Sequence, residues 1–235
     1  MLAFAKKILT RKITAALIDS RLFINRLMLE YSSGKGLLSI LDAGCGSGEK
    51  YNVFFRNLKL FKLYGADLFD KCPNNLLYKY VKVNFDEDDI PFKDKTFDIV
   101  YSNQVIEHLL NKDKFISEIF RVLKKGGLFI VATENIASFD NIISLLFAQE
   151  PLSQHASNCY CLNSFLSPHF MEKKSEVTKG NLGHVNVCSY FGLIRLLKMN
   201  GFKKVKVISF GNLIKIFEIL FPFYNRVLLA YGTKE

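Results

Sequence analysis

The sequence predicts an α/β fold in which a doubly wound, mostly parallel sheet of seven strands is flanked by helices. Short apolar runs alternate with stretches of helical periodicity along most of the chain, the pattern typical of such a sheet. A glycine-rich turn follows directly on the first apolar run, as loops do after buried parallel strands. The chain has 235 residues, of which 49% are hydrophobic and 23% charged, the balance of a globular domain with a sizeable core.

Residues 1–34 are expected to form a basic helical extension, and residues 35–235 the main domain. Apolar residues recur in the extension at spacings of three and four, which predicts a helix with one apolar stripe. The stripe consists of Leu2, Ala5, Leu9, Ile13 and Ala16. The turn signal Ser32-Ser33-Gly34 ends the helix.

Short apolar runs in the main domain predict the strands of the sheet. In chain order the runs are Leu37–Ala43, Lys62–Leu68, Tyr80–Phe85, Phe97–Ser102, Gly127–Ala132, Lys203–Phe210 and Val227–Thr233. A helix is expected over Asn111–Leu123, because it has one apolar face and is followed by Lys124-Lys125-Gly126-Gly127, a pattern that favours a helix end. A second helix is expected from the N-cap Ser189 to Met199.

The segment from Glu134 to Gly183 lacks periodicity and is rich in Ser, Asn, His, Pro and Cys. It is too long for a plain connection between two elements of a compact domain. Because it follows the fifth strand, and ligands of open α/β sheets bind at the carboxyl ends of strands, we expect an insert that covers the active face as a lid.

Cysteine content, hydropathy and net charge indicate where the protein is located and which classes of partner it can bind. Five cysteines without C-x-x-C spacing predict neither a disulfide framework nor a zinc ribbon, so a reducing, cytoplasmic location is expected. No stretch is long and apolar enough to span a membrane, and no signal-peptide pattern is present. The net charge of +10 is compatible with nucleic acid, an anionic membrane surface or an acidic ligand.

The sharpest motif is LDAGCGSG, Leu41 to Gly48, in which glycines follow a predicted strand and precede a predicted helix. Missing side chains let the backbone bend sharply and approach a ligand closely. The dinucleotide pattern G-x-G-x-x-G would need a third glycine at position 49, where the chain has Glu49, and G-x-x-x-x-G-K-[ST] is absent. The loop therefore predicts a nucleoside-like ligand without phosphates.

With the features that follow this loop, the sequence resembles the class I S-adenosylmethionine-dependent methyltransferases, particularly the small bacterial, type 11-like members. The resemblance covers residues 39–135 and, more weakly, 183–201. It consists of LDAGCGSG, Gly65-Ala66-Asp67, Ile90-Pro91-Phe92 with Thr96-Phe97-Asp98, Val105-Ile106-Glu107-His108, and Leu123-Lys124-Lys125-Gly126-Gly127. It implies a Rossmann-like methyltransferase fold whose last strand is antiparallel, with S-adenosylmethionine as methyl donor and S-adenosylhomocysteine as product.

The resemblance also implies a cofactor site. Asp67, with Leu68 beside it, matches the acid that binds the ribose, and Asn84, Phe85 and Asp86 stand where the family meets adenine, without indicating which of them faces the ring. The methionine end would be held by Asp42, Asn103 and Gln104, and Asp42 has a structural role as its alternative. The remaining members of the implied site are Gly44, Cys45, Gly46, Gly48 and His108, of which His108 has packing or helix capping as its alternative.

His184 is the candidate catalytic residue. It stands in Gly183-His184-Val185-Asn186, which matches a place where similar small methyltransferases often carry a histidine near the acceptor. His155, His169 and His184 occur in or near the insert together with Cys159, Cys161 and Cys188. Their spacing does not predict a zinc site, and no metal is expected.

The leading functional interpretation is methyl transfer to a small or a lipid- or sugar-linked acceptor, with oxygen favoured as the methylated atom. An RNA methyltransferase, favoured by the positive charge, and a non-catalytic cofactor-binding protein of the same fold are the alternatives. No RNA-binding module is visible, and N-P-P-[FY], used on amino groups of bases, is absent after the fourth predicted strand. The basic N-terminal helix and the aromatic residues Phe217, Phe221, Phe223 and Tyr224 suit either peripheral contact with an anionic membrane or packing on the domain.

Overall fold

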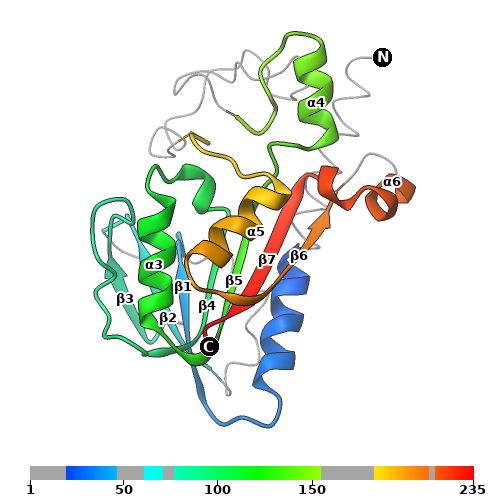
Figure 1. Cartoon of the computed structure of the whole chain (residues 1–235). Helices are drawn as coiled ribbons and strands as arrows, with labels where there is room; N and C mark the ends of the chain where they lie inside the picture. The colour runs from blue at the N-terminus through cyan, green and yellow to red at the C-terminus, as the bar shows by residue number, and fades with distance from the viewer. Residues whose placement is uncertain (1–19, 47–60, 71–76, 155–182, 212–214) are drawn as a thin grey trace.

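The computed structural model describes residues 20–46, 61–70, 77–154, 183–211 and 215–235 (Figure 1). These residues form one seven-stranded sheet with the strand order β3-β2-β1-β4-β5-β7-β6. The strands are β1 (Leu38–Ala43), β2 (Phe61–Asp67), β3 (Lys79–Lys82), β4 (Phe97–Asn103), β5 (Leu123–Glu134), β6 (Lys203–Phe210) and β7 (Val227–Thr233). Neighbours from β3 to β5 pair in parallel, whereas β7 is antiparallel to both β5 and β6. The predicted fold class, including the antiparallel last strand, is confirmed.

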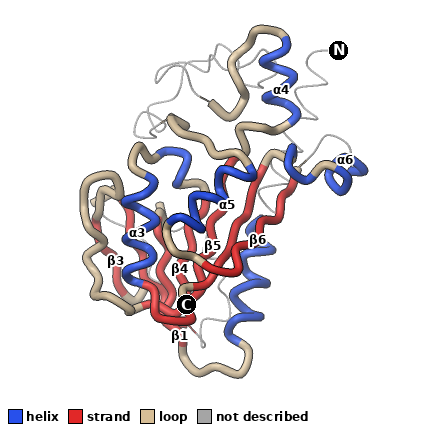
Figure 2. The backbone as a smooth tube through the Cα atoms, in the orientation of Figure 1, coloured by secondary structure: helices blue, strands red, loops and turns tan. Residues whose placement is uncertain are grey.

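Helices cover both faces of the sheet (Figures 1 and 2). Those bounded by the described residues are α3 (Lys112–Val122), α4 (Phe139–Leu146), α5 (Tyr190–Met199) and α6 (Lys215–Leu220), with single 3-10 turns at Ile106–His108 and Pro222–Tyr224. Residues 20–32 are also helical. The N-cap Ser189 of α5 accepts a hydrogen bond from Gly192 N (3.2 Å), as predicted. No helix among the described residues is long and apolar enough to cross a membrane.

Two apolar layers form the core, because successive side chains of a strand point to opposite faces of the sheet. On one face, α3 and α5 bury Phe115, Ile119 and Leu197 against Val100 of β4 and its neighbours. On the other face, the helix of residues 20–32 contributes Ile24, Leu27 and Met28, which contact a set that includes Ile40, Ile99 and Tyr101. The described part of the N-terminal extension is therefore a layer of the domain, while its predicted apolar stripe lies outside the described residues.

Two predicted boundaries were wrong. The glycines Gly126 and Gly127 do not follow a helix end but lie inside β5, which begins at Leu123 directly after α3 and pairs with Phe97. The pairing of β4 with β5 shifts register between Phe97 and Ile99, and Gly126 has a φ of +77°. These glycines therefore lie at an irregularity of β5, where Gly126 adopts a left-handed conformation. The third strand ends at Lys82 rather than Phe85, because Phe85 turns into the core, where its ring lies 5.0 Å from that of Phe115.

The segment after β5 contains a helix that the sequence analysis did not predict. This helix, α4, lies beyond the carboxyl ends of the parallel strands (Figure 1). Its Asp140 makes a buried ion pair with Arg226, which precedes β7, and Arg226 Nε donates to Asp140 Oδ2 at 2.7 Å. Asn141 donates to Ser153 Oγ (2.6 Å) and to Asn135 O (2.9 Å). Buried polar contacts thus fix α4 to the edge of the sheet.

Replacing Asp140 by alanine should lower the free energy of unfolding by about 3 to 5 kcal/mol, because the change leaves the buried guanidinium of Arg226 without its counter-charge. Urea denaturation followed by circular dichroism measures the change. Glu30→Ala is the control, since it breaks an exposed pair with Arg26, and it should cost less than about 1 kcal/mol. Equal effects of the two variants would contradict the anchoring of α4 by this pair.

Candidate functional site

A cleft opens at the carboxyl edge of the sheet, where β1 and β4 are neighbours and their connections leave in opposite directions. Such a switch point is where open α/β sheets bind ligands. The loops after the first four strands supply its walls: Gly44, Gly46, Asp67, Leu68, Phe69, Val83, Asn84, Phe85, Asp86, Asn103, Gln104, Val105, His108 and Leu109. Most of the residues predicted for the cofactor site are therefore brought together.

The glycine loop follows β1 and is held against the end of β2, where Gly44 N donates to Ala66 O (2.8 Å). Gly44 has a φ of +94°, and a Cβ atom there would lie 2.1 Å from Cγ2 of Val105. Gly46 has a φ of +57°, but a Cβ atom there would meet no described atom within 4 Å. The loop is thus close-packed at its first glycine and open at the second, which leaves backbone accessible to a ligand.

Asp67 ends β2 beside this loop. Its Oδ2 accepts a hydrogen bond from Gly46 N and its Oδ1 accepts one from Leu68 N, both at 2.7 Å. These bonds fix the orientation of the carboxylate, and each oxygen retains a further lone pair. The side chain can therefore accept hydrogen bonds from two adjacent hydroxyl groups, as a ribose presents.

Asn84, Phe85 and Asp86 lie in a turn after β3 and all line the cleft. Asn84 Oδ1 accepts from Asp86 N (3.2 Å), and Asp86 Oδ1 accepts from Asn111 N (2.8 Å), ahead of α3. The side-chain oxygen of Asn84 therefore stabilises the turn, and one carboxylate oxygen of Asp86 holds the turn to the start of α3. Phe85 is buried and presents only part of its ring to the cleft.

Asn103 and Gln104, after β4, carry the clearest sign of a missing partner. In the described part of the chain, Asn103 Oδ1 and Gln104 Nε2 are buried without a hydrogen-bond partner. Gln104 also has a φ of +58°, a left-handed conformation that costs a non-glycine residue free energy. Unsatisfied buried polar atoms are rare in folded proteins, so both side chains are placed to bind a polar ligand.

The other predicted site residues lie elsewhere. Asp42 is buried behind the cleft, where it accepts a hydrogen bond from Tyr101 Oη (2.6 Å), and Cys45 is buried in the second apolar layer. Neither lines the cleft. Gly48 lies outside the described residues, as do His155, His169, Cys159 and Cys161.

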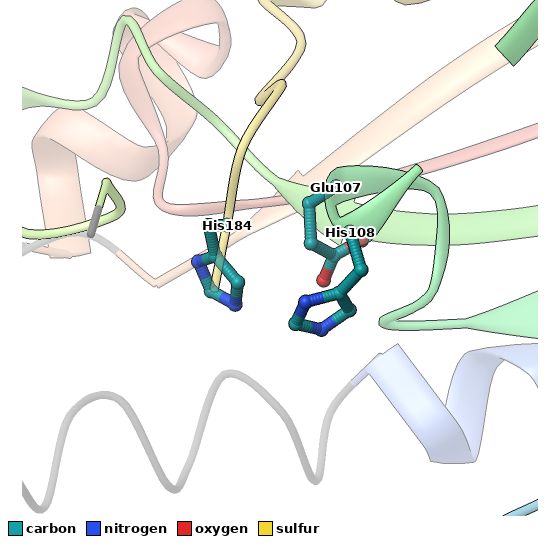
Figure 3. A group of neighbouring side chains, drawn as sticks. All are labelled: Glu107, His108 and His184. Atoms are coloured by element: carbon teal, nitrogen blue, oxygen red, sulfur yellow. The ribbon is translucent and has the colours of Figure 1, made fainter. Parts of the chain in front are cut away.

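His184 does not line the cleft but lies beside it, with its ring centroid 4.8 Å from that of His108 (Figure 3). His184 Nδ1 lies 2.8 Å from Ser153 O. Glu107 completes this group. It is fully buried and accepts a hydrogen bond from Thr133 Oγ1 (2.8 Å), and burial raises its pKa to about 7 against the opposing effect of His184.

In the sequence analysis, Glu107 occurs only within the motif Val105-Ile106-Glu107-His108 and has no assigned role. Its adjacency to His108 was visible, but its contact with His184 depends on the return of the chain after the insert.

A methyltransferase-domain family model matches residues 9–207, which is most of the chain. The chain belongs to the class I S-adenosylmethionine-dependent methyltransferases. It is 33% identical over 103 residues to a probable S-adenosylmethionine-dependent methyltransferase of Mycolicibacterium smegmatis, covering 43% of this chain and 39% of that protein. It is 26% identical over 153 residues to a ubiquinone biosynthesis O-methyltransferase of Rickettsia akari, covering 62% of this chain and 59% of the relative.

The chain thus spans less than two thirds of either relative. Among solved structures, an S-adenosylmethionine-dependent methyltransferase from Mesorhizobium loti superposes with a TM-score of 0.57 at 17% identity, covering 92% of this chain and 98% of the other. This likeness supports the fold. S-adenosylmethionine is the methyl donor of this family. The cleft fits this cofactor, because the accessible backbone at Gly46, the fixed carboxylate of Asp67 and the unsatisfied side-chain amides match its polar groups.

Replacing Asp67 by alanine should weaken S-adenosylmethionine binding by about 1.5 to 3 kcal/mol, the scale of hydrogen bonds to a charged group. Titration calorimetry with the cofactor measures the change. Asp70→Ala is the matched control, because Asp70 is an exposed acid that pairs with Lys82 and does not line the cleft. Binding of NAD in place of S-adenosylmethionine, or equal affinity of both variants, would contradict the assignment.

Proposed function

We propose that this methyltransferase transfers the methyl group to a hydroxyl oxygen of a small or a lipid- or sugar-linked acceptor. The observation that carries the proposal is the contact between His108, on the cleft wall, and His184, which the chain brings back after the insert. A group that handles the acceptor must lie beside the donor site without being part of it, and His184 lies there. The O-methyltransferase activity of the Rickettsia akari relative supports oxygen as the acceptor atom.

In this proposal different loops around the cleft bind different parts of the methyl donor. The backbone at Gly44 and Gly46 approaches the donor, Asp67 binds its ribose, residues 84–86 surround its adenine, and Asn103 and Gln104 hold its methionine end. When bound, S-adenosylmethionine supplies a methyl group already activated by the sulfonium. The protein therefore gains most by aligning the acceptor with that methyl group and excluding water. His184 is the acceptor-side residue, in contact with the acceptor or with its hydroxyl proton.

The insert 134–183 is proposed to cover the acceptor. Its described part includes α4, which lies beyond the strand ends, and Ser153, whose carbonyl oxygen contacts His184 Nδ1. Leu145, Leu146 and Phe147, at the end of α4, are well exposed. Apolar side chains at this edge favour an acceptor with a lipid part, presented by an anionic membrane to a chain of net charge +10.

A panel of acceptors tests the proposal with radiolabelled S-adenosylmethionine as donor. The panel contains a polyprenylated catechol, a sugar nucleotide, an alkylamine and total tRNA. Product that carries a methyl ether on the catechol or the sugar would support the proposal. Label in tRNA would support the RNA alternative, and donor binding without label in any acceptor would support a non-catalytic protein.

Replacing His184 by alanine should reduce methyl transfer by roughly 100-fold, the lower end of what a proton-handling group contributes. Affinity for S-adenosylmethionine should change by less than about 1 kcal/mol, since the substitution removes an interaction made only with the acceptor or the transition state. Single-turnover rates and calorimetry measure the two effects. Unchanged turnover would return His184 to a structural role.

A further inference from the structure

Glu107, His108 and His184 form a compact group of metal-ligand types at the acceptor side of the cleft. Each offers one ligand atom, and these three atoms lie within 4.8 Å of one another. Figure 3 shows the imidazole rings of His108 and His184 side by side, with the carboxylate of Glu107 next to the ring of His108. Two residues come from the 3-10 turn after β4, and the third comes from the far end of the insert.

The carboxylate of Glu107 has one oxygen without a partner. Oε2 accepts the hydrogen bond from Thr133, but Oε1 is buried with no partner among the described residues. The whole residue has 0% exposure, so bulk solvent does not reach this oxygen. An unsatisfied buried carboxylate oxygen costs free energy that a bound cation would offset.

The Nδ1 atom of each histidine lies near a backbone carbonyl oxygen. His184 Nδ1 lies 2.8 Å from Ser153 O, and His108 Nδ1 lies 3.4 Å from Gly183 O. A carbonyl oxygen only accepts hydrogen bonds, so a neutral imidazole in this position has its proton on Nδ1 and its lone pair on Nε2. Metal-bound histidines almost always donate their second ring N–H to a carbonyl or carboxylate in this way.

We propose that Glu107, His108 and His184 bind a divalent transition-metal ion of the Zn²⁺ type beside the donor cleft. Two imidazole nitrogens and one carboxylate oxygen are a ligand set of catalytic zinc, and they leave one coordination position for a further ligand. Bonds to zinc from these atoms are about 2.0 to 2.2 Å long, so the three side chains draw together when the ion binds. Thr133, Ser153 and Gly183 orient them through the hydrogen bonds given above.

The open position gives the ion a place in the reaction, and this step rests on the proposed O-methylation. An acceptor hydroxyl bound there loses its proton to water more readily, because the ion stabilises the oxyanion. The oxygen–carbon bond then forms as the carbon–sulfur bond of the sulfonium breaks, and the neutral thioether leaves. With the ion bound, His184 holds the ion and does not itself contact the acceptor, and the loss of turnover expected for His184→Ala stays the same.

Metal binding is tested on the full chain after removal of metals with a chelator, without any acceptor. Titration with Co²⁺ followed by visible absorption, and with Zn²⁺ by competition, should give one site per chain and no thiolate-to-cobalt band. Glu107→Gln, His108→Ala and His184→Ala should each weaken the affinity at least tenfold. Glu30→Gln, which changes an exposed acid far from this group, should leave it unchanged.

Circular dichroism confirms that each variant is folded, and S-adenosylmethionine affinity confirms it further for Glu107→Gln and His184→Ala, because neither residue lines the cleft. Absence of saturable binding, or binding that the three variants do not weaken, would overturn the proposal, as would a thiolate band that places the ion on cysteine. Binding that depends on the three residues supports it even where no hydroxyl acceptor is methylated, and in that case only the proposed function fails. Loss of O-methylation in the metal-free enzyme, restored by Zn²⁺, supports both.

Discussion

The parallel pairing of β1 with β2 on one side and β4 on the other is the constraint on which the rest of the structure depends. Ile40, Leu41 and Ala43 have no exposed surface, so β1 is fixed in the middle of the sheet with both faces covered. Parallel strands end at the same edge, and the loops after β1, β2, β3 and β4 therefore open there together. The carboxylate of Asp67 and the amide nitrogen of Gly46 meet because of this register, and their hydrogen bond shapes the donor cleft.

A second junction, at Glu107, joins the acceptor side to this frame. Its backbone oxygen accepts hydrogen bonds from Val185 N (3.0 Å) and Asn186 N (3.2 Å), so the chain that returns from the insert is held to the turn after β4. Its side chain is held by Thr133 of β5. One buried residue in the turn after β4 thus contacts two other segments, β5 and the chain that follows the insert, and the position of His184 follows from these contacts. Burial of this carboxyl costs free energy, which the hydrogen bond from Thr133 offsets in part.

Patterns that act over a few residues were sufficient to predict the sheet and most of the residues that line the cleft. Apolar runs marked the strands because buried parallel strands have no polar face, and the glycines of residues 44–46 marked the turn because only glycine fits a positive φ beside Val105. The helix α4 was missed because its Asp140 and Asn141 are buried through contacts with Arg226 and Ser153, which the local pattern does not contain. Phe85 was placed in a strand because its alternation fits one, whereas its contact with Phe115 decides its position.

The two halves of the site therefore differ in how the sequence encodes them. Each donor-side residue stands directly after a strand, so its place follows once the strand is recognised. His108 and Gly183 are 75 positions apart, and His184 and Ser153 are 31 apart, so the proposed acceptor side depends on contacts between distant parts of the chain. A change in the insert can alter the acceptor side while the hydrogen bonds of Asp67 stay intact. Under the proposed function, the donor site therefore depends on the sheet, whereas acceptor choice depends on the segment that Glu107 holds to the sheet.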